Sequence, residues 1–134
     1  MSNPETHHGA CHCGAVKFTV DLDLSQGLSR CNCSFCRRRG ALGAIVKPSA
    51  FHLVSGEPSL SEYAFNARVG HYRFCKVCGV HVYGHGTLDL LGGAFVSVNV
   101  DCIDDVDLSG VEVRYLDGRA DTWQVLRTEI GARW

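Results

Sequence analysis

Short runs of alternating or β-branched apolar residues recur along this chain, and Gly, Pro, Asp or Ser bounds each of them. The runs cover residues 15–20, 44–46, 51–54, 60–65, 80–83, 95–98 and 111–116. A period of two within such short runs predicts β-strands that are buried on one face. Their close spacing favours antiparallel sheets over βαβ units, so the pattern predicts a mainly β fold.

Residues 122–130 allow two interpretations. Asp121 is a suitable N-cap for a helix of one or two turns. The stretch that starts at Thr122 and Trp123 suits a strand equally well. The hydrophobic pattern does not decide between them.

Length and charge narrow the class of protein. The chain has 134 residues, 15 glycines and a formal net charge of −1. This length predicts one domain, residues 1–134, with a core of its own. The balanced charge argues against binding to nucleic acid or to a membrane surface, and no apolar run approaches the roughly 20 residues of a spanning helix. The polar N-terminus shows no signal-peptide pattern, so we expect a reducing, cytoplasmic location.

Seven of the eight cysteines fall into three tight clusters. They are Cys11 and Cys13, then Cys31, Cys33 and Cys36, then Cys75 and Cys78. Separations of one or two residues are unsuited to disulfides within a cluster but allow thiolates to converge on one soft cation. Gly14 and Gly79 follow the outer pairs and permit the positive-φ turn of a zinc knuckle. A redox dithiol at Cys75 and Cys78 is disfavoured, because no βαβ pattern surrounds them.

The cluster sizes predict two zinc ions per chain. The two outer pairs together supply four thiolates, which close a tetrahedral structural site. The middle cluster supplies three thiolates and leaves the fourth position open, as in a reactive site. Losing the closed site is expected to unfold the chain, because structural zinc stabilises small domains strongly.

The open site points to sulfur chemistry. Zinc ionises a bound thiol and polarises a carbonyl, and both effects promote the addition of a thiol to an aldehyde. Arg37 and Arg38 directly follow Cys36 and are our candidates for binding an anionic substrate. The alternative is that Arg37, Arg38 and Arg39 form a solvated turn.

Other residues have both a functional and a structural interpretation. His81, His85 and Cys102 are further possible ligands of the open site, but polar-face histidines and an inert buried thiol are the simpler readings. Asp104 and Asp105 suit either a general base or an ordinary turn. Aromatic side chains suit either a pocket wall near the second metal or the core: Phe35, Tyr72, Phe74 and Trp123.

The three cysteine motifs, at residues 11–16, 31–38 and 72–80, resemble the glutathione-dependent formaldehyde-activating enzyme family, whose domain is shared with centromere protein V. The resemblance extends over residues 9–118. It implies a β-tent fold and the same division of cysteines between a structural zinc and a second, open zinc. It also implies a carbon–sulfur lyase that condenses glutathione, or a related thiol, with formaldehyde to S-hydroxymethylglutathione. The alternatives are a zinc-stabilised, non-catalytic binding module and a zinc or thiol buffering protein.

Overall fold

The computed structural model describes residues 4–65 and 70–131, which form eleven strands, one α-helix and five short 3-10 helices. The strands are β1 (Glu5–Ala10), β2 (Lys17–Leu22), β3 (Leu28–Cys31), β4 (Gly43–Val46), β5 (Phe51–Ser55), β6 (Leu60–Ala64), β7 (Gly70–Cys75), β8 (His81–Leu88), β9 (Gly93–Asn99), β10 (Val111–Leu116) and β11 (Val125–Gly131). The helices are α1 (Ser34–Arg39), η1 (Leu24–Gln26), η2 (Pro48–Ala50), η3 (Glu57–Ser59), η4 (Asp89–Leu91) and η5 (Val100–Cys102).

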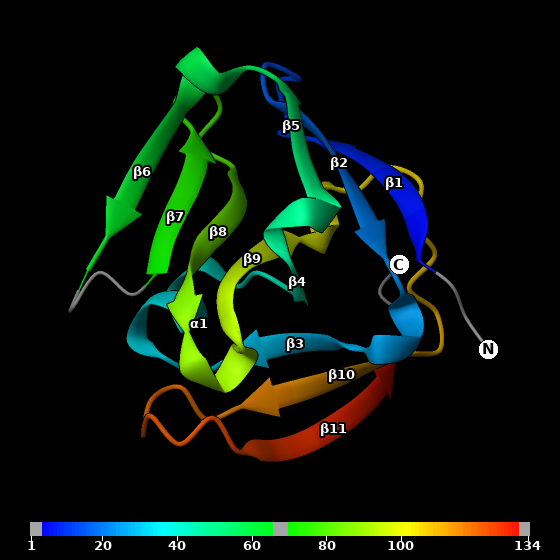
Figure 1. Cartoon of the computed structure of the whole chain (residues 1–134), viewed down its shortest axis with the longest axis vertical. Helices are drawn as coiled ribbons and strands as arrows, with labels where there is room; N and C mark the ends of the chain where they lie inside the picture. Colours follow the sequence, from blue (N-terminus) through cyan, green and yellow to red (C-terminus); the bar gives the residue numbers. More distant parts are fainter. Residues whose placement is uncertain (1–3, 66–69, 132–134) are drawn as a thin grey trace.

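Two sheets form a tent (Figure 1). The small sheet has the order β1-β2-β5, and the large one has the order β11-β10-β3-β4-β9-β8-β7-β6. The small sheet makes one slope, β6 to β8 make the opposite slope, and β3, β10 and β11 cross the base. Neighbouring strands are antiparallel except for β3 and β10, which pair in parallel.

The core lies between the sheets, where the central strands bury apolar side chains from one face. Phe18 and Val20 of β2 and Val82 of β8 are at most 1% exposed. Side chains alternate between the two faces of a strand, so the neighbouring residues of the large sheet point away from this core. Tyr72 and Ser97 lie on that second face, and the cavity described below forms over it.

The predicted mainly β, antiparallel fold is confirmed, and each apolar run corresponds to a strand. In the segment 122–130 the strand interpretation is confirmed by β11, and the helix alternative is wrong. The apolar pattern missed β1, β3, β7 and α1. Polar residues dominate β1, and the six residues of α1 are too few to show a helical period. Within the described part of the chain, no helix is long and apolar enough to cross a membrane.

Candidate metal centres

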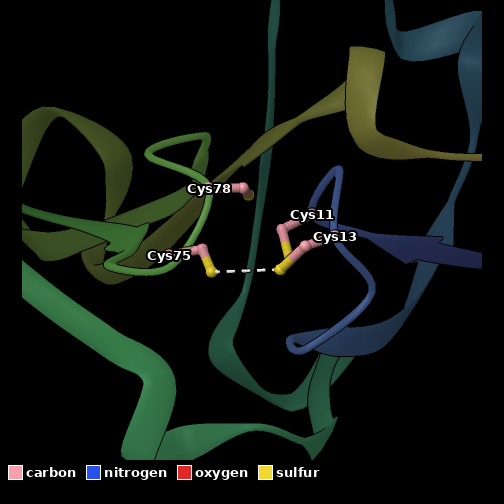
Figure 2. A group of neighbouring side chains, drawn as sticks. All are labelled: Cys11, Cys13, Cys75 and Cys78. Atoms are coloured by element: carbon pink, nitrogen blue, oxygen red, sulfur yellow. Dashed lines mark hydrogen bonds between the residues drawn. The ribbon is translucent and has the colours of Figure 1, made fainter.

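The outer cysteine pairs meet at the junction of the two sheets (Figure 2). Cys11 and Cys13 lie in the loop between β1 and β2, whereas Cys75 and Cys78 lie at the turn between β7 and β8. The two segments are therefore far apart in sequence and belong to different sheets. The sulfur atoms of Cys75 and of the first pair point toward one another across the gap.

The two turns have the same backbone design. The N–H of Cys11 donates to the carbonyl of Val16 at 3.0 Å, and the N–H of Cys75 donates to that of Val80 at 2.9 Å. The glycine after the second cysteine of each pair has a φ of 81° or 79°, which side-chain-bearing residues rarely adopt. Each cysteine pair is therefore held by a turn that requires its glycine.

The sulfur spacing in this quartet fits a tetrahedral zinc ion. The Sγ atoms of Cys11 and Cys13 are 3.6 Å apart, and those of Cys13 and Cys75 are 3.7 Å apart. All four sulfurs lie within 4.8 Å of one another. Zinc–sulfur bonds of about 2.3 Å give a tetrahedron with edges of about 3.8 Å. A hydrogen bond from the Cys13 backbone also lowers the pKa of Cys78 to about 6, which favours the ligating thiolate.

The middle triad is organised by the start of α1. Cys31 ends β3, Cys33 is the N-cap of the helix, and Cys36 lies in its first turns. The N–H of Cys33 donates to Sγ of Cys31 at 3.4 Å, and the N–H of Cys36 donates to Sγ of Cys33 at 3.3 Å. The three sulfurs lie within 4.8 Å of one another. Helix α1, which the hydrophobic pattern did not predict, therefore brings the three sulfurs together.

Arg39, on the last turn of α1, turns back onto the triad. Its Nη2 donates to Sγ of Cys36 at 3.3 Å. Its guanidinium carbon lies 5.2 Å from the ring centre of Phe35 and 5.0 Å from that of Tyr72. Cation–π contacts of this kind hold the guanidinium in place beside the thiolate.

The charge on Arg39 acts on both of its polar neighbours. A hydrogen bond from Cys31 and the nearby Arg39 lower the pKa of Cys36 to about 5. Burial, reinforced by Arg39, lowers the pKa of His81 to about 3. His81 is therefore a neutral imidazole near pH 7, and its Nε2 can accept an N–H from Arg39.

The loop between β10 and β11 closes over Cys31. The Asn32 side chain donates to Asp117 at 3.3 Å and accepts the N–H of Arg119 at 2.8 Å. A Cβ atom on Gly118 would lie 2.3 Å from Sγ of Cys31. Glycine is therefore required where the loop crosses the sulfur.

We expect Gly118→Ala to weaken metal binding at the triad by displacing the sulfur of Cys31. The quartet lies elsewhere, so a variant loaded with two equivalents of zinc should retain about one after mild chelation. Arg119→Ala is the matched control, because it keeps the loop backbone that binds Asn32. Equal retention of metal by Gly118→Ala and the unmodified protein would show that metal binding at the triad does not depend on the space that Gly118 leaves for the sulfur of Cys31.

Two cavities flank the triad. One of about 400 Å³, here called the apolar cavity, is lined by all three cysteines, Arg39, Tyr72, Trp123 and several aliphatic side chains. The other, of about 310 Å³ and here called the basic cavity, is lined by Cys31, Cys36, Arg30, Arg37 and Arg127. A larger cavity of about 660 Å³ lies between the sheets, and no cysteine is among the described residues that line it.

The structure separates the two predicted substrate-binding arginines. Arg37 is exposed and lines the basic cavity. Arg38 is also exposed, and its Nη1 donates to the carbonyl of Ser34 on its own helix at 2.7 Å. Arg39 contacts the triad most directly but is not one of the two arginines predicted from the sequence to bind substrate. Residues three apart on a helix lie on the same side, so the spacing of Cys36 and Arg39 indicates a contact only if residues 34–39 are known to be helical.

The remaining polar candidates follow their structural interpretations, whereas two of the four aromatic candidates form a pocket wall. Among the described residues, the cysteine quartet and triad are the groups whose ligand atoms converge, so neither His81 nor His85 joins the triad. Cys102 is buried, and burial raises its pKa to about 12. Asp105 accepts the N–H of His8 at 3.1 Å and is not among the residues that line either cavity. Of the four aromatic candidates, Tyr72 and Trp123 line the apolar cavity.

Fold and site together define a class: small tent-shaped β proteins with one group of four and one group of three converging cysteines, each of which could hold a metal ion. The model of the glutathione-dependent formaldehyde-activating enzyme family matches residues 6–122, and the chain belongs to this family. The predicted family membership is thereby confirmed. The chain is also similar to a Rhodobacter sphaeroides protein of known crystal structure, with 36% identity and a TM-score of 0.66. That match covers 75% of this chain and 90% of the other.

Proposed function

We propose that this protein is a zinc-dependent carbon–sulfur lyase that condenses glutathione with formaldehyde to S-hydroxymethylglutathione, and that it also catalyses the reverse reaction. The observation that carries the proposal is the convergence of Cys31, Cys33 and Cys36 where the two cavities meet. The identity of the two substrates is inferred from the family to which the chain belongs. In the forward direction a sulfur–carbon bond forms, the carbonyl π bond breaks and the thiol proton is transferred to the carbonyl oxygen.

We propose that both cysteine groups hold zinc. Cys11, Cys13, Cys75 and Cys78 would hold a structural ion, in keeping with their sulfur spacing. Cys31, Cys33 and Cys36 would hold the second ion, which supplies Lewis acidity and favours ionisation of a substrate thiol. Thiolate ligands require a reducing compartment, so we propose a cytoplasmic location, where glutathione keeps thiols reduced.

Arg39 has two tasks in this proposal. Its contact with Cys36 offsets the negative charge of the thiolates. Its fixed N–H groups border the apolar cavity, where they can donate to the aldehyde oxygen as that oxygen gains charge. Neutral His81 keeps the guanidinium oriented without adding a competing cation.

We propose that the basic cavity binds the carboxylates of glutathione. Arg30, Arg37 and Arg127 border it on the far side of Cys31 and Cys36 from the apolar cavity. A peptide thiol bound there would reach the triad with its sulfur, and the reacting carbon would enter the apolar cavity. Guanidinium groups suit this task because they bind carboxylates through paired hydrogen bonds.

The proposal is tested by titrating glutathione into protein loaded with one or two equivalents of zinc. Calorimetry should detect binding only in the form with two zinc ions, and exchange spectroscopy should show condensation with formaldehyde faster than the uncatalysed reaction. Binding of glutathione without a faster condensation would mean that the protein is a glutathione-binding module and not an enzyme. No binding at all, with the second zinc lost to a mild chelator, would instead support metal buffering.

Among the arginines, we expect Arg37→Ala to weaken glutathione binding by about 1–3 kcal/mol, the usual cost of losing a charge-assisted hydrogen bond. Added salt should reduce the difference, because the side chain is exposed. Arg38→Ala is the matched control on the same helix and should change the affinity little, since Arg38 bonds to its own helix. The same affinity in both variants and the unmodified protein would return Arg37 to the solvated-turn interpretation.

A further inference from the structure

Exposed apolar side chains gather around the apolar cavity. Of the nine large hydrophobic residues that are strongly exposed in the described chain, four line this cavity: Ile45, Leu90, Leu91 and Val125. They come from three separate segments: strand β4, helix η4, which holds both leucines, and strand β11. Isolated exposed hydrophobic residues are ordinary, but a cluster around a concave site marks a surface that binds something apolar.

The sheet beneath these side chains is hollowed by small residues. Tyr72, Gly84, Ser97 and Ile45 are successive partners across β7, β8, β9 and β4. Gly84 and Ser97 have small side chains, so the sheet surface is hollow between the larger side chains of Tyr72 and Ile45. A Cβ atom on Gly84 would already lie 3.2 Å from the ring of Tyr72. The hollow therefore results from small residues in the middle of one face of the sheet.

The apolar lining exceeds what the proposed substrates use. Formaldehyde adds one carbon and one oxygen to the thiol, and glutathione itself is a polar, charged tripeptide. The cavity of about 400 Å³ lies within the range of about 300–1,000 Å³ that is usual for small-molecule sites. Its aliphatic and aromatic wall borders the same sulfurs as Arg39. An apolar group attached to the reacting carbon would lie against this wall.

We propose that the site accepts thiol adducts of aldehydes larger than formaldehyde, with an apolar alkyl or aryl group in the apolar cavity. This inference rests on the proposed function. The step has the same balance as with formaldehyde: the thiol sulfur bonds to the aldehyde carbon, the carbonyl π bond breaks, and the thiol proton is transferred to oxygen. No oxidant or reductant takes part.

The test uses S-alkylglutathiones with methyl, butyl and hexyl groups as unreactive adduct analogues. Calorimetry on the protein with two zinc ions should show affinity rising about two- to fourfold per added methylene until the cavity is filled. In the double variant Leu90→Ser/Leu91→Ser this dependence on chain length should flatten. Val54→Ser is the control, because Val54 is an apolar residue on β5, is 61% exposed and does not line the apolar cavity, and this variant should keep the full dependence.

The outcomes separate this inference from the function on which it rests. Binding of S-methylglutathione that does not improve with chain length would overturn the inference alone. No binding of any glutathione derivative would overturn the proposed function and the inference together. If the affinity of the unmodified protein does not depend on alkyl chain length, and if this protein is a dimer that dissociates in Leu90→Ser/Leu91→Ser, the apolar wall would instead bind a second copy of this chain.

Discussion

Cys75→Ser is expected to abolish cooperative folding. Cys75 is fully buried, and its sulfur faces Cys13 on the other sheet at 3.7 Å. Structural zinc is worth about 10–16 kcal/mol in small peptides, which matches or exceeds the whole stability of about 5–15 kcal/mol of an ordinary domain. The variant should be insoluble or molten, lack a sharp thermal transition and gain nothing from added glutathione. Circular dichroism melts and zinc analysis would measure this.

Cys102→Ala is the matched control for that experiment. Cys102 is also a buried cysteine of the core, but it lies outside the quartet and the triad. Removing its sulfur should cost only about 1 kcal/mol and leave the zinc content unchanged. Comparable losses of stability in Cys75→Ser and Cys102→Ala would show that packing, and not metal, accounts for the role of Cys75.

Cys36→Ser is expected to remove the second zinc and glutathione-dependent activity while leaving the fold intact. The triad spans six residues, so joining its members removes little chain entropy on folding. Serine keeps an acceptor for Nη2 of Arg39 but is a poor ligand for zinc. Zinc content should fall from two ions to one per chain, and glutathione should no longer bind in calorimetry. The melting transition should stay cooperative.

Ser34→Ala, at an exposed position of the same helix, controls for damage to α1 and should keep both metals. The decisive comparison is between Cys36→Ser and Cys75→Ser. If both unfold, both sites are structural and the enzymatic proposal loses its main support. If both fold normally with two zinc ions, the assignment of the ligands fails.

The β-strands that pack on the core were readable from the sequence because burial of one face leaves a period of two. Residues Val111–Leu116 formed a strand with the predicted limits. β1 was missed because its residues are mostly polar and only two of the six are buried. β7 was missed for the same reason: it is one of the inner strands of the large sheet, but only Cys75 among its residues is fully buried. Hydrogen-bonded pairing with neighbours, and not its own hydrophobicity, makes it a strand.

The sequence by itself determined which cysteines lie close within each cluster, because residues one to three apart are neighbours in any fold. The meeting of Cys11 and Cys13 with Cys75 and Cys78 joins two different sheets and depends on the tertiary structure. The sequence also determined the knuckle glycines, because a positive φ is a local requirement. Only the tertiary structure decided that Arg39 and not Arg38 contacts the triad, that Gly118 crosses Cys31, and that Gly84 and Ser97 on two paired strands hollow out the apolar cavity. These features join segments far apart in the chain, and their contacts depend on sheet order and strand register, which no local pattern encodes.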